Sequence, residues 1–346
     1  MESKQEDITT SPFYKKGLCG LTNLGNTCFM NTIVQCLNSN RDFATIFLTD
    51  AYKSSINSDK IDHNLVEQWA LLCKGLYKRN CVVTPTSFHK VVQIIALKKG
   101  RDVFVGYGQN DSQEFLQYFL ETLHNGLAKE VIMTINGEPE NDLDKMAVEA
   151  LTNWKGFFKN DYSLIVEMFY GQLHSKITTV DNPEYKSTTY DPFSNLSLEI
   201  PDGDNISIYD CLDHFNRKEE LEGHKQNEED EKTYSKQMSF WSTPKYLIVF
   251  FKRYNSRGQK ISKVIDFPIK NLNLSKYCVG YDKDNSRYDL HAVANHAGGL
   301  GGGHYWAYTK NLDGNWYKYN DKFVSLKKES ELVTSEVYCL FYKKKD

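Results

Sequence analysis

Cys28 marks the point where a loop rich in glycine and asparagine meets a segment whose apolar residues recur at helical spacing. Ile33, Val34 and Leu37 follow this spacing, which predicts a helix that starts at or just after Cys28. A thiol at the amino end of a helix meets outward-pointing N–H groups and the positive end of the helix dipole, and both favour the nucleophilic thiolate. Cys28 is therefore a candidate nucleophile. A small buried cysteine that starts a core helix is the alternative interpretation, because free cysteine is among the most buried residue types.

The loop before this cysteine, GLTNLGNT, also carries side-chain amides. Gly25 allows a tight turn, and Asn26 or Thr27 suits the N-cap of the following helix. The amides of Asn23 and Asn26 are hydrogen-bond donors of the kind that stabilise an oxyanion on a carbonyl under attack. A nucleophile with oxyanion donors beside it is what acyl-transfer chemistry needs.

A cysteine nucleophile also needs a base close to the thiol and a polar group that orients the base. Among nine histidines, His304 follows the glycine-rich loop GGLGGG and heads the aromatic, strand-like segment HYWAY. Asp313-Gly314 is a strong signal for a two-residue hairpin turn, which folds NWYKYND back alongside that strand. The hairpin would bring Asn320 or Asp321 within reach of the imidazole. A histidine on a strand is more often structural, so that interpretation stays open here.

Composition narrows the class of protein. The chain has 346 residues, 40% of them hydrophobic, and a formal net charge of −3, which suits one large domain or two closely packed ones and argues against nucleic acid as the main partner. No apolar run is long enough to predict a membrane span. Residues 1–14 are expected to form a polar, disordered leader without the apolar core of a secretory signal. The eight cysteines contain no C-x-x-C pair and predict reduced thiols in a cytoplasmic or nuclear protein.

The first part of the chain, from residue 17 to about 128, is predicted to be mainly helical. Residues 65–77 and 87–97 are two of its helices. A longer helix begins at Asp111, where Glu114 three residues later gives a start that resembles a capping box. Its apolar stripe consists of Leu116, Leu120, Leu123 and Leu127.

The second half is predicted to consist of strands. Residues 129–165 are hard to place and include a solvated loop and a short helix at 145–158. The strand-like segments are FYGQLHSKITTV, KYLIVFFKRY, YDLHAVANHAG, HYWAYTKN, NWYKYND and EVYCLFYKK. Helices first and strands later predict an α+β fold with a mostly antiparallel sheet.

Three motifs resemble the ubiquitin-specific proteases, a family of papain-like cysteine peptidases. GLTNLGNTCFMN resembles the cysteine box of the family, and QNDSQEF resembles its second signature, usually QQDAQEF. GHY followed by WYKYND resembles its histidine box. The resemblance extends over roughly residues 16–343. It implies one catalytic domain at 15–345, with a helical thumb at about 17–128 and a β-sheet palm with extended β fingers at about 165–345.

The resemblance implies a role for each catalytic residue. Cys28 is the implied nucleophile, Asn23 helps to form the oxyanion hole, and His304 is the general base. Asn320 occupies the third position, and the adjacent acid Asp321 shares or takes over its orienting role.

The same resemblance implies a site for the C-terminal tail of ubiquitin. Asp111 corresponds to the family's aspartate that contacts the basic tail, and Gln109, His296 and Tyr305 complete the implied tail-binding set. For His296, support of the glycine-rich loop is the alternative role.

The implied activity is thiol-dependent cleavage of the isopeptide or peptide bond after the C-terminal glycine of ubiquitin, through a thioester on Cys28. The implied partners are ubiquitin and ubiquitinated proteins, with no nucleic acid and no membrane. An activating protein partner is left open, since some family members rest misaligned until one binds. Two other functions remain: a catalytically silent ubiquitin-binding scaffold, and a protease for a ubiquitin-like modifier.

The sequence departs from the family at the fingers. Most members carry two C-x-x-C pairs there that bind structural zinc, whereas the corresponding stretches here, KITTVDNP and TYSKQMSF, have no cysteine. Cys211 and His214 form one C-x-x-H pair, but a closed zinc site needs four ligands. SIYDCLDHF is better interpreted as a helix with Ser207 at its start. We therefore predict no zinc and no other cofactor.

Overall fold

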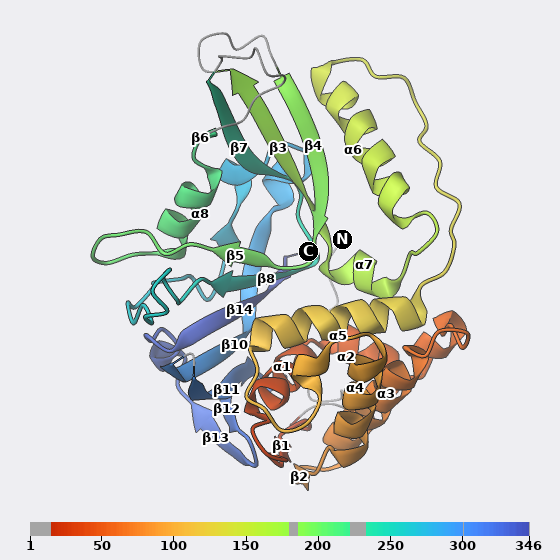
Figure 1. Ribbon diagram of the computed structural model, residues 1–346, viewed down its shortest axis with the longest axis vertical. Helices are drawn as coiled ribbons and strands as arrows, with labels where there is room; N and C mark the ends of the chain where they lie inside the picture. Colours follow the sequence, from red (N-terminus) through yellow and green to blue (C-terminus); the bar gives the residue numbers. More distant parts are fainter. Residues whose placement is uncertain (1–14, 180–185, 222–232, 300, 346) are drawn as a thin grey trace. The chain divides into compact units, whose positions relative to one another are not determined.

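The computed structural model describes residues 15–179, 186–221, 233–299 and 301–345 (Figure 1). The predicted leader, residues 1–14, lies outside the described residues. The chain forms two compact units, a first one of Met1–Ala128, Arg253–Val264 and His291–Phe341, and a second one of Lys129–Lys252, Ile265–Leu290 and Tyr342–Asp346.

The first unit begins with helices, coloured red to yellow in Figure 1. They are α1 (Cys28–Asn38), α2 (Arg41–Leu48), α3 (His63–Lys78), α4 (Thr86–Lys98) and α5 (Ser112–Leu127), with short 3-10 turns at Ala51–Ser55 and Asp102–Phe104. The side chain of Asp111 caps α5 by accepting hydrogen bonds from the backbone N–H groups of Gln113 and Glu114. The structure confirms the four helices that the sequence predicted in this unit, namely α1, α3, α4 and α5. Their core is aromatic, since Trp69 lies edge-to-face against Phe119 with ring centroids 5.2 Å apart.

An antiparallel sheet completes the first unit. Its strands lie wholly or mostly in this unit and follow the spatial order β13 (Phe323–Lys327), β12 (Trp316–Asn320), β11 (Gly302–Lys310), β10 (Arg287–Gly299) and β14 (Val337–Lys344). Helix α1 packs against β11. The predicted hairpin between β11 and β12 is confirmed, but its loop has five residues, 311–315, where two were expected. Gly314 has a φ of 81°, the left-handed conformation that this turn requires.

A short parallel pair lies beside the start of α1. It consists of β1 (Gly20–Leu21) and β2 (Val82–Val83), with Gly20 opposite Val82. The backbone N–H of Leu21 donates to the carbonyl of Asp321 at 2.8 Å. The pair therefore connects the chain that precedes Cys28 to the turn after β12.

In the described residues of the second unit there is a four-stranded antiparallel sheet and there are three α-helices. Its elements are α6 (Asp142–Phe158), α7 (Leu164–Phe169), β3 (Gly171–Thr179), β4 (Lys186–Phe193), β5 (Leu196–Leu198), α8 (Ile208–Asn216), β6 (Glu219–Leu221), β7 (Tyr234–Ser242), β8 (Tyr246–Phe251) and β9 (Leu272–Asn273). The sheet order is β4-β3-β7-β6, and α6 packs against β4 through Ala147, Ala150 and Tyr190. The predicted helix at SIYDCLDHF is confirmed as α8, with a full capping box between Ser207 and Asp210.

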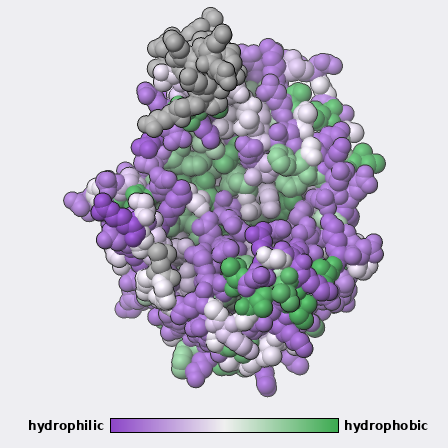
Figure 2. Space-filling view, in the orientation of Figure 1, coloured by the Kyte–Doolittle hydropathy of each residue, from purple (hydrophilic) through white to green (hydrophobic). Residues whose placement is uncertain are grey.

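The face that Figure 2 shows is mostly hydrophilic and carries hydrophobic patches. Among the helices of the described residues, none is long and apolar enough to cross a membrane. Together the two units have the predicted α+β composition, with mostly antiparallel strands and parallel pairing at β1–β2 and β5–β8.

Candidate active site

All nine predicted site residues belong to the first unit. Cys28 is the first residue of α1 and is 5% exposed. Burial raises the pKa of its thiol, the backbone N–H of Tyr305 donates to the sulfur and lowers it, and the charge of Asp321 raises it again. The net direction is upward, so burial outweighs the helix end that was expected to favour the thiolate. The thiol is therefore protonated at rest and needs a base to remove its proton.

His304 and Asn320 form the pair that such a base requires. Nε2 of His304, on β11, lies 2.6 Å from Oδ1 of Asn320, the last residue of β12. Because an amide oxygen only accepts, Nε2 carries the hydrogen and Nδ1 is left with a lone pair. The ring also stacks on Trp306, with centroids 6.3 Å apart. The predicted contact between His304 and Asn320 is present.

Cys28 and His304 come from adjacent elements, since α1 packs against β11 and the residue after His304 donates to the Cys28 sulfur. Within the part of the chain that the structure describes, however, the thiol and the imidazole form no hydrogen bond with each other. In unliganded enzymes such bonds are often long and shorten when substrate binds.

Asp321 lies elsewhere than expected. Its φ of 48° turns the chain into the left-handed region directly after β12. Its carboxylate accepts hydrogen bonds from the amide nitrogens of Asn23, at 3.0 Å, and Asn31, at 2.8 Å. Among the described residues it makes no hydrogen bond to the imidazole, so the orienting role that it was expected to share or take over stays a prediction. That contact belongs to Asn320.

Asn23 is held by hydrogen bonds at both ends of its amide. Its Oδ1 accepts from the backbone N–H groups of Gly25, at 3.0 Å, and Thr27, at 3.1 Å. Its Nδ2 donates to Asp321. An amide nitrogen carries two hydrogens, and Asp321 takes one, which leaves the other for a ligand. Asn26 has different partners: its amide nitrogen donates to the carbonyl of Tyr107 at 2.8 Å, and its Oδ1 lies 3.5 Å from the amide nitrogen of Gln109.

The four predicted tail-binding residues line one open pocket. The full lining is Gln109, Asn110, Asp111, Tyr254, His296, Gly299, Gly303 and Tyr305. The pocket lies between the start of α5 and the glycine-rich end of the β10–β11 hairpin. Residues far apart in the sequence therefore gather as predicted.

Within this pocket Gln109 and Asp111 already have partners. Oε1 of Gln109 accepts from the backbone N–H of Gly303 at 2.8 Å. Besides capping α5, Asp111 accepts from the hydroxyl of Tyr338 at 2.6 Å and from that of Tyr305 at 3.5 Å. The charge of Asp111 is thus shared between a helix end and two tyrosines.

His296 lies against the glycine-rich loop. It is 4% exposed, and its ring centroid lies 4.3 Å from that of Tyr305. Burial, followed by the charge of Lys260, lowers the pKa of His296 to about 4. A neutral ring that lies against Gly303 fits the supporting role, because a Cβ on that glycine would meet Nε2 of His296 at 2.3 Å.

Sequence reasoning missed three residues that hold this site. Asn31 lies one helical turn after Cys28, inside the cysteine box, so its position on the same helix face was an available signal. Tyr338 and Lys260 come from segments without a motif. Lys260 nevertheless donates to the backbone carbonyl of His296 at 2.6 Å.

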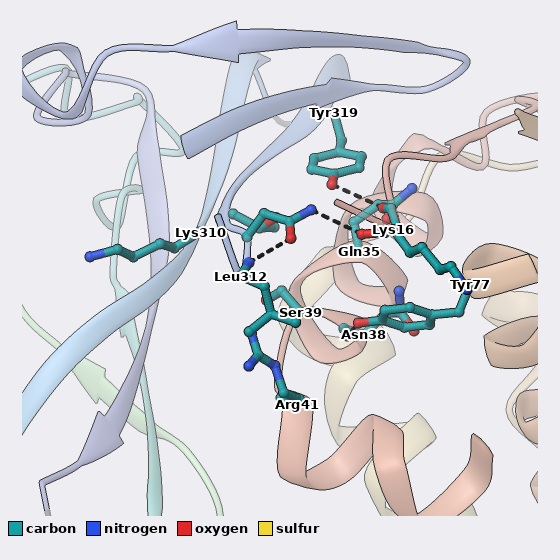
Figure 3. A pocket seen from close by; sticks show the side chains of 12 residues that line it. Lys16, Gln35, Asn38, Ser39, Arg41, Tyr77, Lys310, Leu312 and Tyr319 are labelled. Carbon is teal, nitrogen blue, oxygen red and sulfur yellow. Dashed lines mark hydrogen bonds between the residues drawn. The ribbon is translucent and has the colours of Figure 1, made fainter. Parts of the chain in front are cut away.

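A second pocket of the first unit, drawn in Figure 3, contains none of the predicted site residues. The hydroxyl of Tyr319 donates to the carbonyl of Gly17 at 3.1 Å, and the amide of Asn311 donates to the carbonyl of Lys16 at 3.0 Å. These bonds connect the segment before β1 to the β11–β12 hairpin, so the residues around this pocket have a structural role.

The donors for zinc do not fit together. Cys211 is fully buried, and Nε2 of His214 lies 3.2 Å from a carboxylate oxygen of Glu199. No group of three or more His, Cys, Asp or Glu side chains placed to hold a metal ion occurs in the described residues. The absence of zinc remains a prediction that metal analysis must test.

A thiol at a helix start, with an imidazole held by an asparagine amide on an adjacent strand of an α+β fold, defines a papain-like cysteine peptidase. A family model described as "Ubiquitin carboxyl-terminal hydrolase" matches residues 19–342. The chain therefore belongs to the ubiquitin carboxyl-terminal hydrolase family.

Individual relatives agree with this assignment. The chain is 34% identical over 342 residues to ubiquitin carboxyl-terminal hydrolase 2 of Homo sapiens, covering 94% of this chain and 55% of that protein. It is 34% identical over 360 residues to ubiquitin carboxyl-terminal hydrolase 21 of Homo sapiens, covering 94% and 61%. The chain thus spans about half the length of the curated relatives it matches.

Among solved structures, the chain is similar to one in the SAGA Ubp8/Sgf11/Sus1/Sgf73 DUB module bound to ubiquitin aldehyde. The TM-score is 0.72 at 28% sequence identity, and the match covers 97% of this chain and 71% of that chain. The α+β fold class predicted from the sequence is confirmed by this similarity.

Proposed function

We propose that this chain is a thiol-dependent deubiquitinating hydrolase that cleaves the isopeptide or peptide bond after the C-terminal glycine of ubiquitin. The observation that carries the proposal is the 2.6 Å contact between His304 and Asn320, on strands that follow one another beside the helix that begins with Cys28. Family membership and the ubiquitin aldehyde bound in the related DUB module support the choice of substrate.

The proposed mechanism follows from the available atoms. Nδ1 of His304 takes the proton of Cys28, and the thiolate attacks the carbonyl of the terminal glycine of ubiquitin. The free N–H of Asn23 stabilises the oxyanion, a kind of donor worth about 3 kcal/mol. His304 then protonates the leaving amine of lysine. Water hydrolyses the thioester in a second pass, with His304 again as the base.

In this mechanism Asp321 acts through Asn23. Two hydrogen bonds from asparagine amides fix its carboxylate, and one of them orients the proposed oxyanion donor. Its negative charge also raises the pKa of Cys28. We therefore infer that Asp321 is a positioning residue.

For substrate binding, we propose that the pocket between α5 and the β10–β11 hairpin takes the extended tail of ubiquitin. Gln109 then exchanges its bond to the backbone of Gly303 for one to the tail. Tyr305 and Asp111 also line this pocket, and the ring of His296 lies against Gly303. Residues 15–345 act as one catalytic domain in this proposal, with a thumb at about 17–128 and palm and fingers at about 165–345.

We propose a cytoplasmic or nuclear location with ubiquitinated proteins as partners. All eight cysteines are free in the structure, as expected in a reducing compartment. An activating protein partner stays an expectation. It is supported by the partner proteins in the related DUB module.

The test is a ubiquitin that carries an electrophile at its C-terminus. We expect the wild-type chain to form a covalent adduct and the Cys28→Ser variant to form none. A silent scaffold would bind ubiquitin without labelling, and a modifier-specific enzyme would label only with a probe built on its own modifier. Either result would contradict the proposal. Slow labelling that a partner protein accelerates would support activation.

A further inference from the structure

Cys19 and Cys81 lie side by side where β1 and β2 begin. The residues that follow them, Gly20 and Val82, are paired in a parallel register. The backbone N–H of Cys81 lies 3.3 Å from the sulfur of Cys19, and the N–H of Gly20 donates to the carbonyl of Cys81 at 3.1 Å. Neighbouring strands run about 4.8 Å apart, inside the range of about 4.4–6.8 Å that a disulfide spans between Cα atoms.

The two thiols differ in their access to solvent. Both are free, and Cys19 is fully buried whereas Cys81 is half-buried. Burial, together with the charge and thiol of Cys81, raises the pKa of Cys19 to about 11. A dissolved oxidant therefore reaches Cys81 first, and the thiol of Cys19 can react with the oxidised Cys81 in a second step.

Cys19 is joined to the elements that carry the active site. Its S–H group lies 3.0 Å from the carbonyl of Leu76 and 2.9 Å from that of Arg79, at the end of α3. Its own carbonyl accepts from Nε2 of Gln35 on α1 at 2.8 Å. Space beside it is tight, because a Cβ on Gly20 would meet the carbonyl oxygen of Lys322 at 2.2 Å. A movement of Cys19 must therefore also displace α1 and the turn that contains Asp321.

We propose that Cys19 and Cys81 form a modification site, a pair of thiols that peroxide oxidises to a disulfide. The disulfide lowers the rate of hydrolysis reversibly. The Cys81 thiolate attacks one oxygen of hydrogen peroxide, the O–O bond breaks, and a sulfenic acid and hydroxide form. The Cys19 sulfur then attacks the sulfenic sulfur, the S–O bond breaks, and water leaves. Two thiols and one peroxide give one disulfide and two waters. The carbonyls of Leu76 and Arg79 lose their thiol donor.

The first arm of the test is chemical and does not depend on the proposed function. The full chain carrying Cys28→Ser is treated with hydrogen peroxide, alkylated, digested without reductant and analysed by mass spectrometry. We expect one pair of peptides linked through Cys19 and Cys81. The link should disappear after treatment with dithiothreitol, and it should not form in a chain that carries both Cys28→Ser and Cys81→Ser. The matched control Cys278→Ser should keep the link. Sulfinic or sulfonic acid at Cys81 without any link would overturn the proposal.

The second arm measures regulation and rests on the proposed function. Peroxide also oxidises the thiol of Cys28, so recovery with arsenite, which reduces sulfenic acids and spares disulfides, is compared with recovery by dithiothreitol. We expect wild type to regain only part of its activity with arsenite and all of it with dithiothreitol, a several-fold gap. Cys81→Ser should recover fully with either reagent. Equal recovery in both proteins would overturn the regulatory role, whereas a chain inactive before oxidation would refute the proposed function and leave the first arm valid.

Discussion

At the scale of single residues, Cys28 is subject to opposing influences. Its place at the start of α1 and the N–H of Tyr305 favour the thiolate, while burial and the charge of Asp321 disfavour it and win. A thiol with a raised pKa is a weak nucleophile until a base removes its proton. His304 must therefore remove the proton of Cys28 during the attack, and the rate of the attack depends on how the imidazole ring is oriented.

This argument ranks two variants. His304→Ala removes the base, and we expect kcat/KM to fall by about 100- to 10,000-fold. Asn320→Ala leaves the base but frees its ring, so the loss should be smaller. Hydrolysis of ubiquitin with a C-terminal fluorophore measures both, and unchanged affinity for ubiquitin serves as the control. Equal and complete losses would contradict an orienting role for Asn320.

The bond between Asn23 and Asp321 allows a double-mutant cycle. Asn23→Ala removes the proposed oxyanion donor and should lower kcat by about 100- to 1,000-fold. Asp321→Ala leaves that donor without its anchor and should lower kcat in the same direction. The double variant should lose little more than the worse single variant, because residues that act as one unit are not additive.

A matched control for this cycle is Asn26→Ala. Asn26 belongs to the same loop, but its amide nitrogen donates to the carbonyl of Tyr107 and not to Asp321, so Asn26 lies outside the coupled pair. We expect a clearly smaller loss of kcat than for Asn23→Ala. Losses at Asn23 and Asp321 that simply add would show that the two residues act separately.

At the scale of elements, the glycine-rich end of the β10–β11 hairpin has two glycines that the packing requires. They are Gly298, where a Cβ would lie 2.4 Å from the carbonyl oxygen of Gly302, and Gly303. A Cβ on Gly303 would lie 2.3 Å from Nε2 of His296 and 2.5 Å from the carbonyl oxygen of Ala297. A Cβ on Gly301 would meet nothing within 4 Å. The run of glycines in the sequence is therefore heterogeneous, and only part of it is needed for close contact.

Gly303 and Gly301 make a paired prediction. Gly303→Ala overpacks the loop and should cost about 1–3 kcal/mol of unfolding free energy, together with most of the hydrolytic activity. Gly301→Ala should leave the unfolding free energy within about 0.5 kcal/mol of wild type. Urea unfolding and hydrolysis of the ubiquitin fluorophore check both. Equal effects of the two substitutions would mean that His296 does not restrain the loop at Gly303.

At the scale of the whole molecule, the sequence predicted the elements and the residues that meet better than it predicted their contacts. The helices that begin at Cys28 and Ser112 follow from apolar spacing, and the second also from the cap that Asp111 supplies, all of which are local properties. Thr27, the N-cap of the first helix, makes no side-chain capping bond. The role of Asp321 depends on one left-handed φ after β12, which no spacing reveals. The raised pKa of Cys28 likewise depends on burial, which the whole fold sets.

The same limit applies to residues without a motif. Tyr338 reaches Asp111 across 227 positions of the chain, and neither residue's neighbours in the sequence indicate the contact. The hairpin loop of five residues shows a related effect, because Asp313-Gly314 predicted the turn but not its length. Local signals thus give the turn, and tertiary packing sets its form.

The last prediction concerns metal and the sheet of the second unit. No cysteine occurs on β3, β4 or β7, and these strands are joined by antiparallel ladders, with His174 opposite both Tyr190 and Ser239. The β3–β7 ladder has one register shift, between Gln172 and Leu173. Side chains add to it, since Phe215 of α8 stacks on Phe240 at 5.9 Å and the amide of Asn216 donates to the carbonyl of Met238. Hydrogen bonds and aromatic packing therefore hold these strands together, a role that four zinc ligands would otherwise have.

We expect purified protein to contain far less than one zinc per chain, and a strong chelator to leave its melting temperature unchanged. Structural zinc sites contribute directly to folding, so removal of a bound ion would lower the melting temperature by many degrees. Phe240→Ala, by contrast, removes a fully buried ring and should cost about 3–5 kcal/mol. Stoichiometric zinc, or unfolding by the chelator, would show that this sheet depends on a metal ion rather than on the packing around Phe240.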